Sequence, residues 1–320
     1  MRSLFVSYKG RDSSVDAVRG LDLDLHRGEA VALVGESAAG KSTAALAILQ
    51  ILPGNAESSG EIVFDGLTMN EATEPELRHV RGDEISIIFQ DAQSALTPTM
   101  SVGHQMAELF REHRNMRQDE AELAAVEVLR KVLPDPVQVA RSYPFQLSGG
   151  MAQRALIAMA MALDPAVVIA DEPTSSLDAS VRQEMLDWLE QMRDDRDVAV
   201  LLITHDLGIV ARFADRVAVM YAGEIVESAD VRTIFREPKH PYTFGLLQSV
   251  PTLTGERGRR LPVMTGQPPD LSDLPPQCPF LPRCNKATSC CRTDAAPVLE
   301  ATGEGGLVAC YNPIVVPVAG

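Results

Sequence analysis

The stretch "VALVGESAAGKST" at residues 31–43 decides the fold of this 320-residue chain. An apolar run leads into the spacing G-x-x-x-x-G-K-S, formed by Gly35, Gly40, Lys41 and Ser42, and a helix-forming run follows. Backbone N–H groups of such a loop, together with the helix dipole, favour a bound phosphate. The lysine adds a positive charge and the serine hydroxyl suits Mg²⁺. The stretch therefore predicts a strand, a phosphate loop and a helix.

Other apolar runs predict an α/β fold with a parallel sheet. They show no alternation of polar and apolar residues, as expected of strands buried on both faces. These runs are "AVALVG" (30–35), "EISIIF" (84–89), "AVVIAD" (166–171) and "VAVLLITH" (198–205). Residues 92–160 carry helical patterns and predict an inserted helical subdomain, whereas prolines become frequent after residue 236. We expect an extended, weakly regular tail there.

Composition excludes several classes of protein. A net charge of −15 argues against a general surface for nucleic acid or anionic lipid, because phosphate binding relies on Lys and Arg. The N-terminus has no apolar region of a secretory signal, and no apolar run reaches the ~18–20 residues that cross a bilayer. We therefore expect a cytoplasmic protein, and a reducing cytosol disfavours disulfides as the use of its cysteines.

A carboxylate pair ends one of the predicted strands. Asp171 and Glu172 lie in "VVIADEP", and ligands of open α/β sheets bind at the carboxyl ends of strands. Asp171 then suits Mg²⁺, and Glu172 suits orienting or deprotonating an attacking water. Such a pair by itself is more often the start of a solvated loop. The phosphate loop in the same chain reverses that preference.

A second glycine-rich turn precedes a long predicted helix. "QLSGGMAQRALIAMAMAL" places Ser148, Gly149 and Gly150 at the helix N-terminus, where backbone donors and the absence of side chains favour a phosphate. By itself the turn would be a simple helix cap. Two phosphate-binding turns in one chain instead indicate that two chains share each nucleotide.

In this order and spacing, the motifs resemble those of the nucleotide-binding subunits of ABC transporters over nearly the whole chain. "LSGGMAQR" is similar to the ABC signature, "SSLD" (175–178) to the loop after the carboxylate pair, and "ITHD" to the motif of the switch histidine, His205. Gln90 in "IIFQD" is similar to the glutamine that links the γ-phosphate site to the helical subdomain. Tyr8 in "VSYKG" lies where the family has an aromatic that stacks on adenine.

The resemblance implies a RecA-like α/β core with an N-terminal antiparallel β portion, an inserted helical subdomain and a C-terminal extension that contains cysteines. The expected domains are an ATPase domain at 1–235, with 92–160 inserted, and the extension at 236–320. The implied nucleotide ligands of one chain are Tyr8, Gly35, Glu36, Ser37, Ala38, Ala39, Gly40, Lys41, Ser42, Thr43, Gln90, Asp171 and Asp178. Ser148, Gly149 and Gly150 would bind the nucleotide of the partner subunit. The implied catalytic residues are Glu172, His205 and Gln90, and the implied Mg²⁺ ligands are Ser42, Gln90 and Asp171.

Three positions depart from the family pattern. Ala38 replaces a glycine of the phosphate loop, Ala92 a common proline, and Ala152 a common arginine of the signature. None of these changes removes a chemical group that the mechanism needs. We therefore expect function to survive, with small effects on the geometry of the phosphate loop.

A narrower resemblance to dipeptide and oligopeptide importers rests on "LTPTMSVGHQM", "EPKHPYTFGLLQSVP" and "GQPPDLSDLPPQCPFLPRC". It implies ATP hydrolysis coupled to peptide import at the cytoplasmic face of the inner or plasma membrane. The implied partners are a homologous ATP-binding subunit in a head-to-tail dimer, two permeases and an extracytoplasmic peptide-binding protein. The open alternatives are a nickel, glutathione or sugar importer, an ABC ATPase that acts on nucleic acid, and an iron–sulfur electron-transfer protein.

All five cysteines lie in the last part of the chain. The family pattern selects Cys278, Cys284, Cys291 and Cys310, with the spacing C-x5-C-x6-C-x18-C, and leaves Cys290 over. Structural zinc usually has tighter pairs. We favour a [4Fe–4S] cluster that clips the tail, with zinc, free thiols or adventitious disulfides as alternatives. We expect its loss to leave ATP binding nearly unaffected, because the phosphate loop would lie in another domain.

Overall fold

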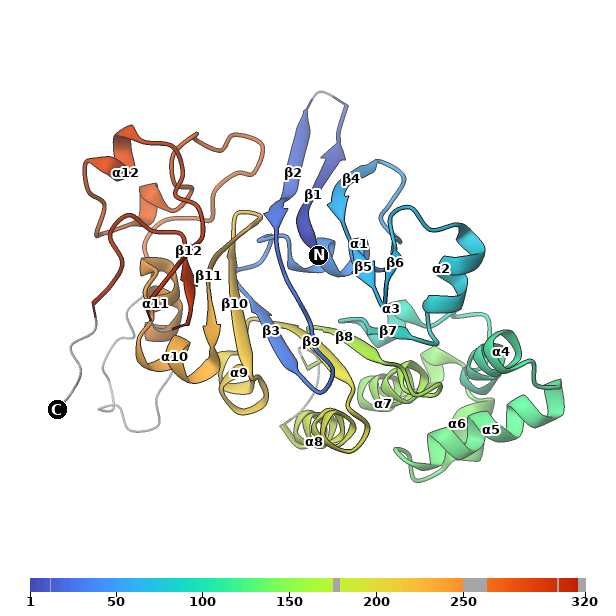
Figure 1. The fold of residues 1–320 in the computed structure, drawn as a ribbon. Coiled ribbons are helices and arrows are strands. Elements are labelled where there is room, and N and C mark those ends of the chain that lie inside the picture. The colour runs from blue at the N-terminus through green and yellow to red at the C-terminus, as the bar shows by residue number, and fades with distance from the viewer. Residues whose placement is uncertain (12, 175–178, 250–263, 304, 316–320) are drawn as a thin grey trace. The chain divides into compact units, whose positions relative to one another are not determined.

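The computed structural model describes residues 1–11, 13–174, 179–249, 264–303 and 305–315 (Figure 1). The chain divides into two compact units. The first unit comprises Met1–Asp24, Val31–Asn70 and Ile203–Gly320. The second unit comprises Leu25–Ala30 and Glu71–Leu202. The phosphate loop and the cysteines therefore belong to the first unit, and the predicted helical subdomain belongs to the second.

A three-stranded antiparallel sheet in the first unit confirms the predicted β portion near the N-terminus. Its strand order is β2-β1-β4, formed by β1 (Arg2–Lys9), β2 (Ser14–Leu21) and β4 (Ala56–Glu61). Leu4 and Val6 of β1 are buried, whereas Phe5 between them is exposed, because successive side chains of a strand point to opposite faces. The hairpin of β5 (Val63–Phe64) and β6 (Leu67–Thr68) follows.

The strand that leads into the phosphate loop is buried along its whole length. β3 (Ala30–Val34) pairs in parallel with β10 (Arg216–Tyr221), which explains its continuous apolar sequence. Antiparallel pairing then extends from β10 to β11 (Glu224–Asp230), β13 (Leu307–Val308) and β12 (Glu300–Ala301). Figure 1 shows β12 in red beside β11. The end of the chain thus adds two short strands to the sheet that carries the phosphate loop.

The residues after 236, which we call the extension, share a core with the rest of the first unit. Tyr242 and Phe280 are buried against Tyr221 at the end of β10. This sharing agrees with the expectation that the tail has little core of its own. The helices of the first unit are α1 (Lys41–Ile48), α9 (Leu207–Phe213), α10 (Val231–Arg236), α11 (Pro241–Gln248), α12 (Cys290–Thr293) and a 3₁₀ turn at Leu281–Arg283.

The second unit confirms the inserted helical subdomain. Its strands β7 (Ile85–Ile88) and β8 (Val167–Asp171) pair in parallel, and most of its helices lie between them in the chain. β9 (Ala199–Thr204) begins in this unit and ends in the first. The helices are α2 (Glu74–Val80), α3 (Ala92–Ala95), α4 (Val102–Arg114), α5 (Gln118–Arg130), α6 (Pro136–Arg141), α7 (Gly149–Ala160) and α8 (Ala179–Arg196), with a 3₁₀ turn at Pro144–Gln146.

Local signals define α4, one of the two 13-residue helices of the inserted segment. Ser101 caps α4 by accepting a hydrogen bond from the His104 N–H group at 3.4 Å, and Asn115 ends it in the left-handed region at φ 53°. Arg114 in its last turn pairs with the buried Asp83 at 2.7 Å and donates to the Leu163 carbonyl at 3.0 Å. These bonds attach α4 to the strand-bearing part of the unit. Within the described ranges, no helix combines the length and apolar character that a membrane span requires.

Candidate functional site

Two glycines shape the phosphate loop, which runs from Gly35 to Gly40 between β3 and α1. Gly40 has φ 102°, in the region that favours glycine, and a Cβ atom there would lie 2.1 Å from the Ala17 carbonyl oxygen. A Cβ atom on Gly35 would lie 2.2 Å from the Met220 carbonyl oxygen. Both positions therefore exclude a side chain because neighbouring backbone packs against the loop. The required glycines of the motif have a steric cause in this fold.

Lys41 is the first residue of α1 and holds the loop from inside. Its ammonium group donates to the carbonyl oxygens of Gly35 and Glu36, both at 2.9 Å, and the residue is buried at 6% exposure. Ser42 is exposed, and Thr43 is half-buried. The cation, the serine hydroxyl and the first N–H groups of α1 thus lie at one helix N-terminus, which is the arrangement that binds phosphate.

The middle of the loop carries the departure from the family pattern. Ala38 adopts φ 64°, in the left-handed region where an L side chain is strained by ~1–2 kcal/mol. Ser37 and Ala38 are exposed, whereas Ala39 is buried. The glycine that the family has at this position would remove the strain. The substitution removes no chemical group from the loop, and its effect on loop geometry stays a prediction.

Two further predicted residues lie in the first unit. The Tyr8 hydroxyl and the Thr43 hydroxyl oxygen are 3.2 Å apart, so the aromatic residue of β1 lies directly beside the helix of the phosphate loop. His205 follows β9 and is exposed. The next residue, Asp206, caps α9 by accepting from the N–H groups of Gly208 and Ile209. The structure therefore joins Tyr8 to the loop and leaves the His205 side chain at a strand end.

The carboxylates and Gln90 lie at one edge of the parallel pair in the second unit. Ile88 of β7 is aligned with Ala170 of β8, so the residues that follow both strands leave the sheet on the same side. Gln90 is exposed there, and Asp171 is buried at 8% exposure. Glu172 has φ 45°, a strained conformation for a residue other than glycine.

The signature turn caps α7. Ser148 accepts a hydrogen bond from the Met151 N–H group at 3.3 Å, and both Ser148 and Gly149 are exposed. A Cβ atom on Gly149 would meet nothing within 4 Å. Packing inside this chain therefore does not require that glycine, which fits a surface that an outside group approaches closely. Asp178 and the rest of the predicted loop at 175–178 lie outside the described residues.

Sequence reasoning missed a contact that links the signature helix to the carboxylate loop. The Gln153 side chain, buried at 1% exposure, donates to the Pro173 carbonyl oxygen at 3.1 Å. Pro173 directly follows Glu172, so the orientation of α7 and that of the carboxylate loop depend on each other. The available signal was the glutamine in "LSGGMAQR".

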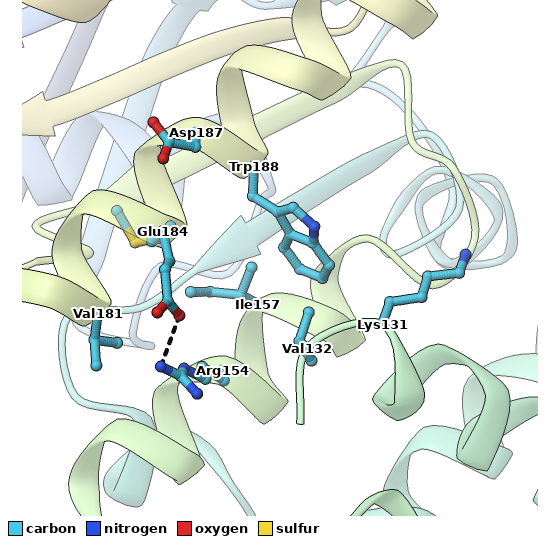
Figure 2. A pocket seen from close by; sticks show the side chains of 9 residues that line it. Lys131, Val132, Arg154, Ile157, Val181, Glu184, Asp187 and Trp188 are labelled. Carbon is cyan, nitrogen blue, oxygen red and sulfur yellow. Dashed lines mark ion pairs between the residues drawn. The ribbon is translucent and has the colours of Figure 1, made fainter. Parts of the chain in front are cut away.

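A hollow on the second unit lies beside the signature helix (Figure 2). Ile157 of α7 and Trp188 of α8 line it, and Arg154 pairs with Glu184 across it at 2.7 Å. Its lining includes none of the predicted nucleotide residues. The hollow therefore marks how α7 packs on α8. Its half-buried Trp188 is the single tryptophan of the sequence and reports on this packing.

The extension contacts the phosphate loop, which the sequence did not indicate. The Glu36 N–H group donates to the Tyr242 hydroxyl at 2.8 Å. The Arg283 guanidinium donates to both carboxylate oxygens of Glu36, at 2.6 and 2.9 Å. The Glu36 carboxylate is therefore paired with Arg283 and does not present a free negative charge at the phosphate loop. This contact contradicts the premise that the loop is independent of the tail.

Four of the five cysteines lie near one another. Burial is the largest cause that raises the pKa of the Cys278 thiol to about 11, and the charges of Cys310, Cys284 and Cys291 contribute to this shift. Burial also raises the pKa values of Cys284 and Cys310. Cys291 is buried, whereas Cys290 is exposed. The four residues that the family pattern selects are therefore the grouped ones.

The four thiols are not arranged around a single small ion. Among the described residues, the one set of three or more possible ligand atoms within 4.8 Å of one another is that of His79, Asp83 and Glu84. A tetrahedral zinc site with Zn–S bonds of about 2.3 Å would place its sulfur atoms closer than that. This spacing gives no support to a structural zinc ion at the cysteines, and no metal site is evident there.

Two family models match this chain. Residues 18–175 match the model described as ABC transporter, and residues 226–291 match that of the oligopeptide/dipeptide transporter C-terminal region. The dipeptide transport ATP-binding protein DppD of Bacillus subtilis is 44% identical over 296 residues, which are 91% of this chain and 88% of that protein. The oligopeptide transport ATP-binding protein OppD of Salmonella typhimurium is 40% identical over 315 residues, or 98% of this chain and 93% of that protein.

A solved structure is similar as well. The dimeric ATP-binding cassette MJ0796 bound to ADP and Pi, in a post-hydrolysis state, has a TM-score of 0.63 and 26% identity. The match covers 72% of this chain and 97% of that one.

Proposed function

Because the chain belongs to the ATP-binding subunits of ABC transporters, in their oligopeptide/dipeptide branch, we propose that it hydrolyses ATP to energise peptide import through separate membrane subunits. The observation that carries the proposal is the phosphate loop at residues 35–43, in a chain whose relatives are named as dipeptide and oligopeptide transport ATP-binding proteins over most of their length. The extension matches the family-specific C-terminal region and favours the peptide branch over other ABC ATPases.

The phosphate loop binds the β- and γ-phosphates in this proposal. The backbone N–H groups of residues 37–43 donate to phosphate oxygens, and Lys41 turns its ammonium group from the loop carbonyls to the phosphates. Ser42 and Asp171, with Gln90, are the proposed ligands of Mg²⁺. Their hydroxyl, carboxylate and amide oxygens are the hard donors that this ion prefers, and Mg²⁺ supplies charge neutralisation at the phosphates.

Glu172 is the proposed general base. It orients or deprotonates the attacking water, and the strained backbone at φ 45° holds its side chain at the end of β8. Gln90 and His205 would hold the water and the γ-phosphate. Tyr8 would stack on adenine, and its hydroxyl contact with Thr43 keeps the ring beside the loop.

The complete site requires two subunits in this proposal. Ser148, Gly149 and Gly150 would bind the nucleotide held by the partner subunit. The exposed N-terminus of α7 supports this role, and the similar cassette MJ0796 forms a dimer. The partner subunit in this proposal is a homologous ATP-binding subunit, and the other proposed partners are two permeases and an extracytoplasmic peptide-binding protein. The chain would lie at the cytoplasmic face of the membrane, attached through the permeases.

A [4Fe–4S] cluster on Cys278, Cys284, Cys291 and Cys310 is the proposed cofactor of the extension. The grouping of these four partly or fully buried cysteines supports it, and several iron atoms separate their thiolates more widely than one zinc ion does. When bound, the cluster would clip a segment that has little core. Anaerobically purified protein should be brown, with about four iron and four sulfide per chain. Cys284→Ser should bleach it, whereas Cys290→Ser should not; a colourless, metal-free protein would reject the cluster.

The transport proposal is tested in vesicles that contain the full complex with its permeases. We expect oligopeptides or dipeptides, presented with the binding protein, to stimulate ATP hydrolysis, and Glu172→Gln to abolish this stimulation. Nickel, glutathione and sugars serve as competing substrates. Stimulation by one of these and not by peptides would reject the peptide assignment. Salt-sensitive binding to DNA or ribosomes without transport would reject the importer altogether.

A further inference from the structure

Glu36, the first residue of the phosphate loop after Gly35, is bound on three sides. Its carbonyl oxygen accepts from Lys41 at 2.9 Å, its N–H group donates to the Tyr242 hydroxyl at 2.8 Å, and its carboxylate accepts two hydrogen bonds from Arg283. Lys41 lies within the loop, whereas Tyr242 and Arg283 are 206 and 247 residues away in the chain. The carbonyl oxygen also accepts from the Ala39 N–H group at 3.3 Å, so the loop holds the carbonyl of Glu36, whereas the extension holds its N–H group and its carboxylate.

Contacts other than the ion pair with Glu36 also hold the Arg283 guanidinium in place. Its side chain is only 5% exposed in the ion pair. The guanidinium lies 5.8 Å from the centre of the Tyr221 ring and 5.9 Å from that of Phe280, and its Nε atom donates to the Thr265 carbonyl at 3.2 Å. A cation stacked on aromatic faces and paired bidentately with a carboxylate has little freedom to move. Loss of the carboxylate would leave a nearly buried positive charge without its main partner.

Tyr242 is placed with equal precision. It is fully buried, and its ring packs against Tyr221 and Phe280 with centroids 4.6 and 5.5 Å apart. Its own N–H group donates to the His240 Nδ1 atom at 3.0 Å, which anchors the start of α11. These contacts fix the orientation of the ring, so the Tyr242 hydroxyl points toward the Glu36 N–H group. The aromatic core of the extension and the first residue of the phosphate loop form one packed assembly.

We propose that Arg283 and Tyr242 are positioning residues for the nucleotide site, through which the extension sets the affinity for ATP. This inference rests on the proposed role of the phosphate loop. When Lys41 turns to the phosphates, Glu36 loses the hydrogen bond from the ammonium group, and the contacts from the extension still hold its N–H group and its carboxylate. With Glu36 fixed, the N–H groups that follow it keep their direction toward the phosphates and need no reordering when nucleotide binds.

The cysteines would also affect nucleotide binding through Arg283. Arg283 is directly followed by Cys284 and lies in the segment that begins at Cys278. Any change that loosens this segment moves the guanidinium away from Glu36. Loss of the grouped cysteines is therefore expected to weaken ATP binding, the reverse of what an independent tail predicts.

The test compares Arg283→Gln, Arg283→Lys and Glu36→Gln in the full complex, purified anaerobically. Fluorescent ATP-analogue binding, KM for ATP, kcat and the melting temperature are measured for each. We expect Arg283→Gln and Glu36→Gln each to raise Kd and KM about 10-fold, the scale of a lost charge-assisted bidentate pair, with kcat changed less than about 3-fold. The double variant should be no worse than the weaker-binding single variant, because both changes break the same pair. Arg283→Lys should restore part of the affinity.

Matched controls lie in the same extension. Arg292 is an exposed cation, and Tyr311 donates its hydroxyl to the Ala295 carbonyl at 2.8 Å. Arg292→Gln and Tyr311→Phe should leave Kd unchanged, whereas Tyr242→Phe should raise it. Wild-type affinity in both Arg283→Gln and Glu36→Gln would overturn the inference, as would additive losses in the double variant.

Different outcomes would reject the proposed nucleotide site and the proposed role of the extension. If Lys41→Ala binds the ATP analogue as well as the wild type does, the proposed site itself is wrong. If Lys41→Ala loses binding and the Arg283 and Tyr242 variants do not, only the role of the extension is rejected. Should Arg283→Gln fail to fold, Glu36→Gln decides, because it breaks the same pair from the exposed loop and leaves the extension intact.

Discussion

Replacing His240 by Asn tests how acid acts on the packing between the extension and the loop. His240 is 1% exposed. Its backbone N–H group donates to the buried Glu227 carboxylate at 2.8 Å, and its imidazole Nδ1 atom accepts from the backbone N–H group of Tyr242 at 3.0 Å. Burial lowers the pKa of this imidazole from 6.5 to about 3. The folded protein thus keeps the imidazole neutral at pH values where the unfolded chain protonates it.

The sign and size of the effect follow from the two pKa values. Between pH 6.5 and pH 3 the unfolded chain binds a proton that the folded chain does not, so stability is present above this range and is lost as the pH falls through it. From pH 7.5 to pH 5 the loss amounts to about 2 kcal/mol. Glu227 acts in the opposite direction, because burial raises the pKa of its carboxyl and the folded state takes up the proton first.

The assay is urea unfolding of the full chain, followed by circular dichroism at pH 7.5, 6.5, 5.5 and 5.0. His240→Asn keeps a side-chain acceptor for the Tyr242 N–H group but does not titrate in this range. The wild type should lose about 2 kcal/mol more than the variant between pH 7.5 and pH 5, and the Glu227 contribution cancels in this difference. His26→Asn, at an exposed histidine, should show the wild-type slope. Equal pH slopes for the wild type and His240→Asn would refute the reasoning.

Three further predictions concern the nucleotide site. Glu172→Gln should keep ATP binding and slow hydrolysis by ~10²–10⁴-fold, measured at the site that this chain contributes; near-normal turnover would remove Glu172 from the role of base. Lys41→Ala should lose nucleotide affinity, whereas Ser148→Arg should keep binding to the isolated subunit but block dimer closure; equal losses of binding would contradict a site shared between subunits. Ala38→Gly should stabilise the chain by roughly 0.5–1 kcal/mol, because it relieves an L residue at φ 64°, and an unchanged or lower melting temperature would argue against that strain.

Local sequence was sufficient for the parts of the site that are built from neighbouring residues. The phosphate loop follows from Gly35, Gly40 and Lys41 because a strand, a tight turn and a helix N-terminus are all short-range structures. Ser148 caps α7 for the same reason. The apolar runs predicted the buried strands, since burial on both faces leaves a continuous signature. The helical insertion between β7 and β8 followed from periodicity.

Only the tertiary structure decided which distant residues meet. Arg283 lies in a proline-rich segment without periodicity, and nothing in its neighbourhood indicates that its partner is Glu36, 247 residues away. The grouping of the thiols and the contact of Tyr8 with Thr43 likewise depend on how strands and loops pack. The local sequence determines hydrogen-bonding and steric preferences that act within a few residues. A bidentate ion pair between remote segments exists only after packing has brought them together and removed water, so no local pattern records it.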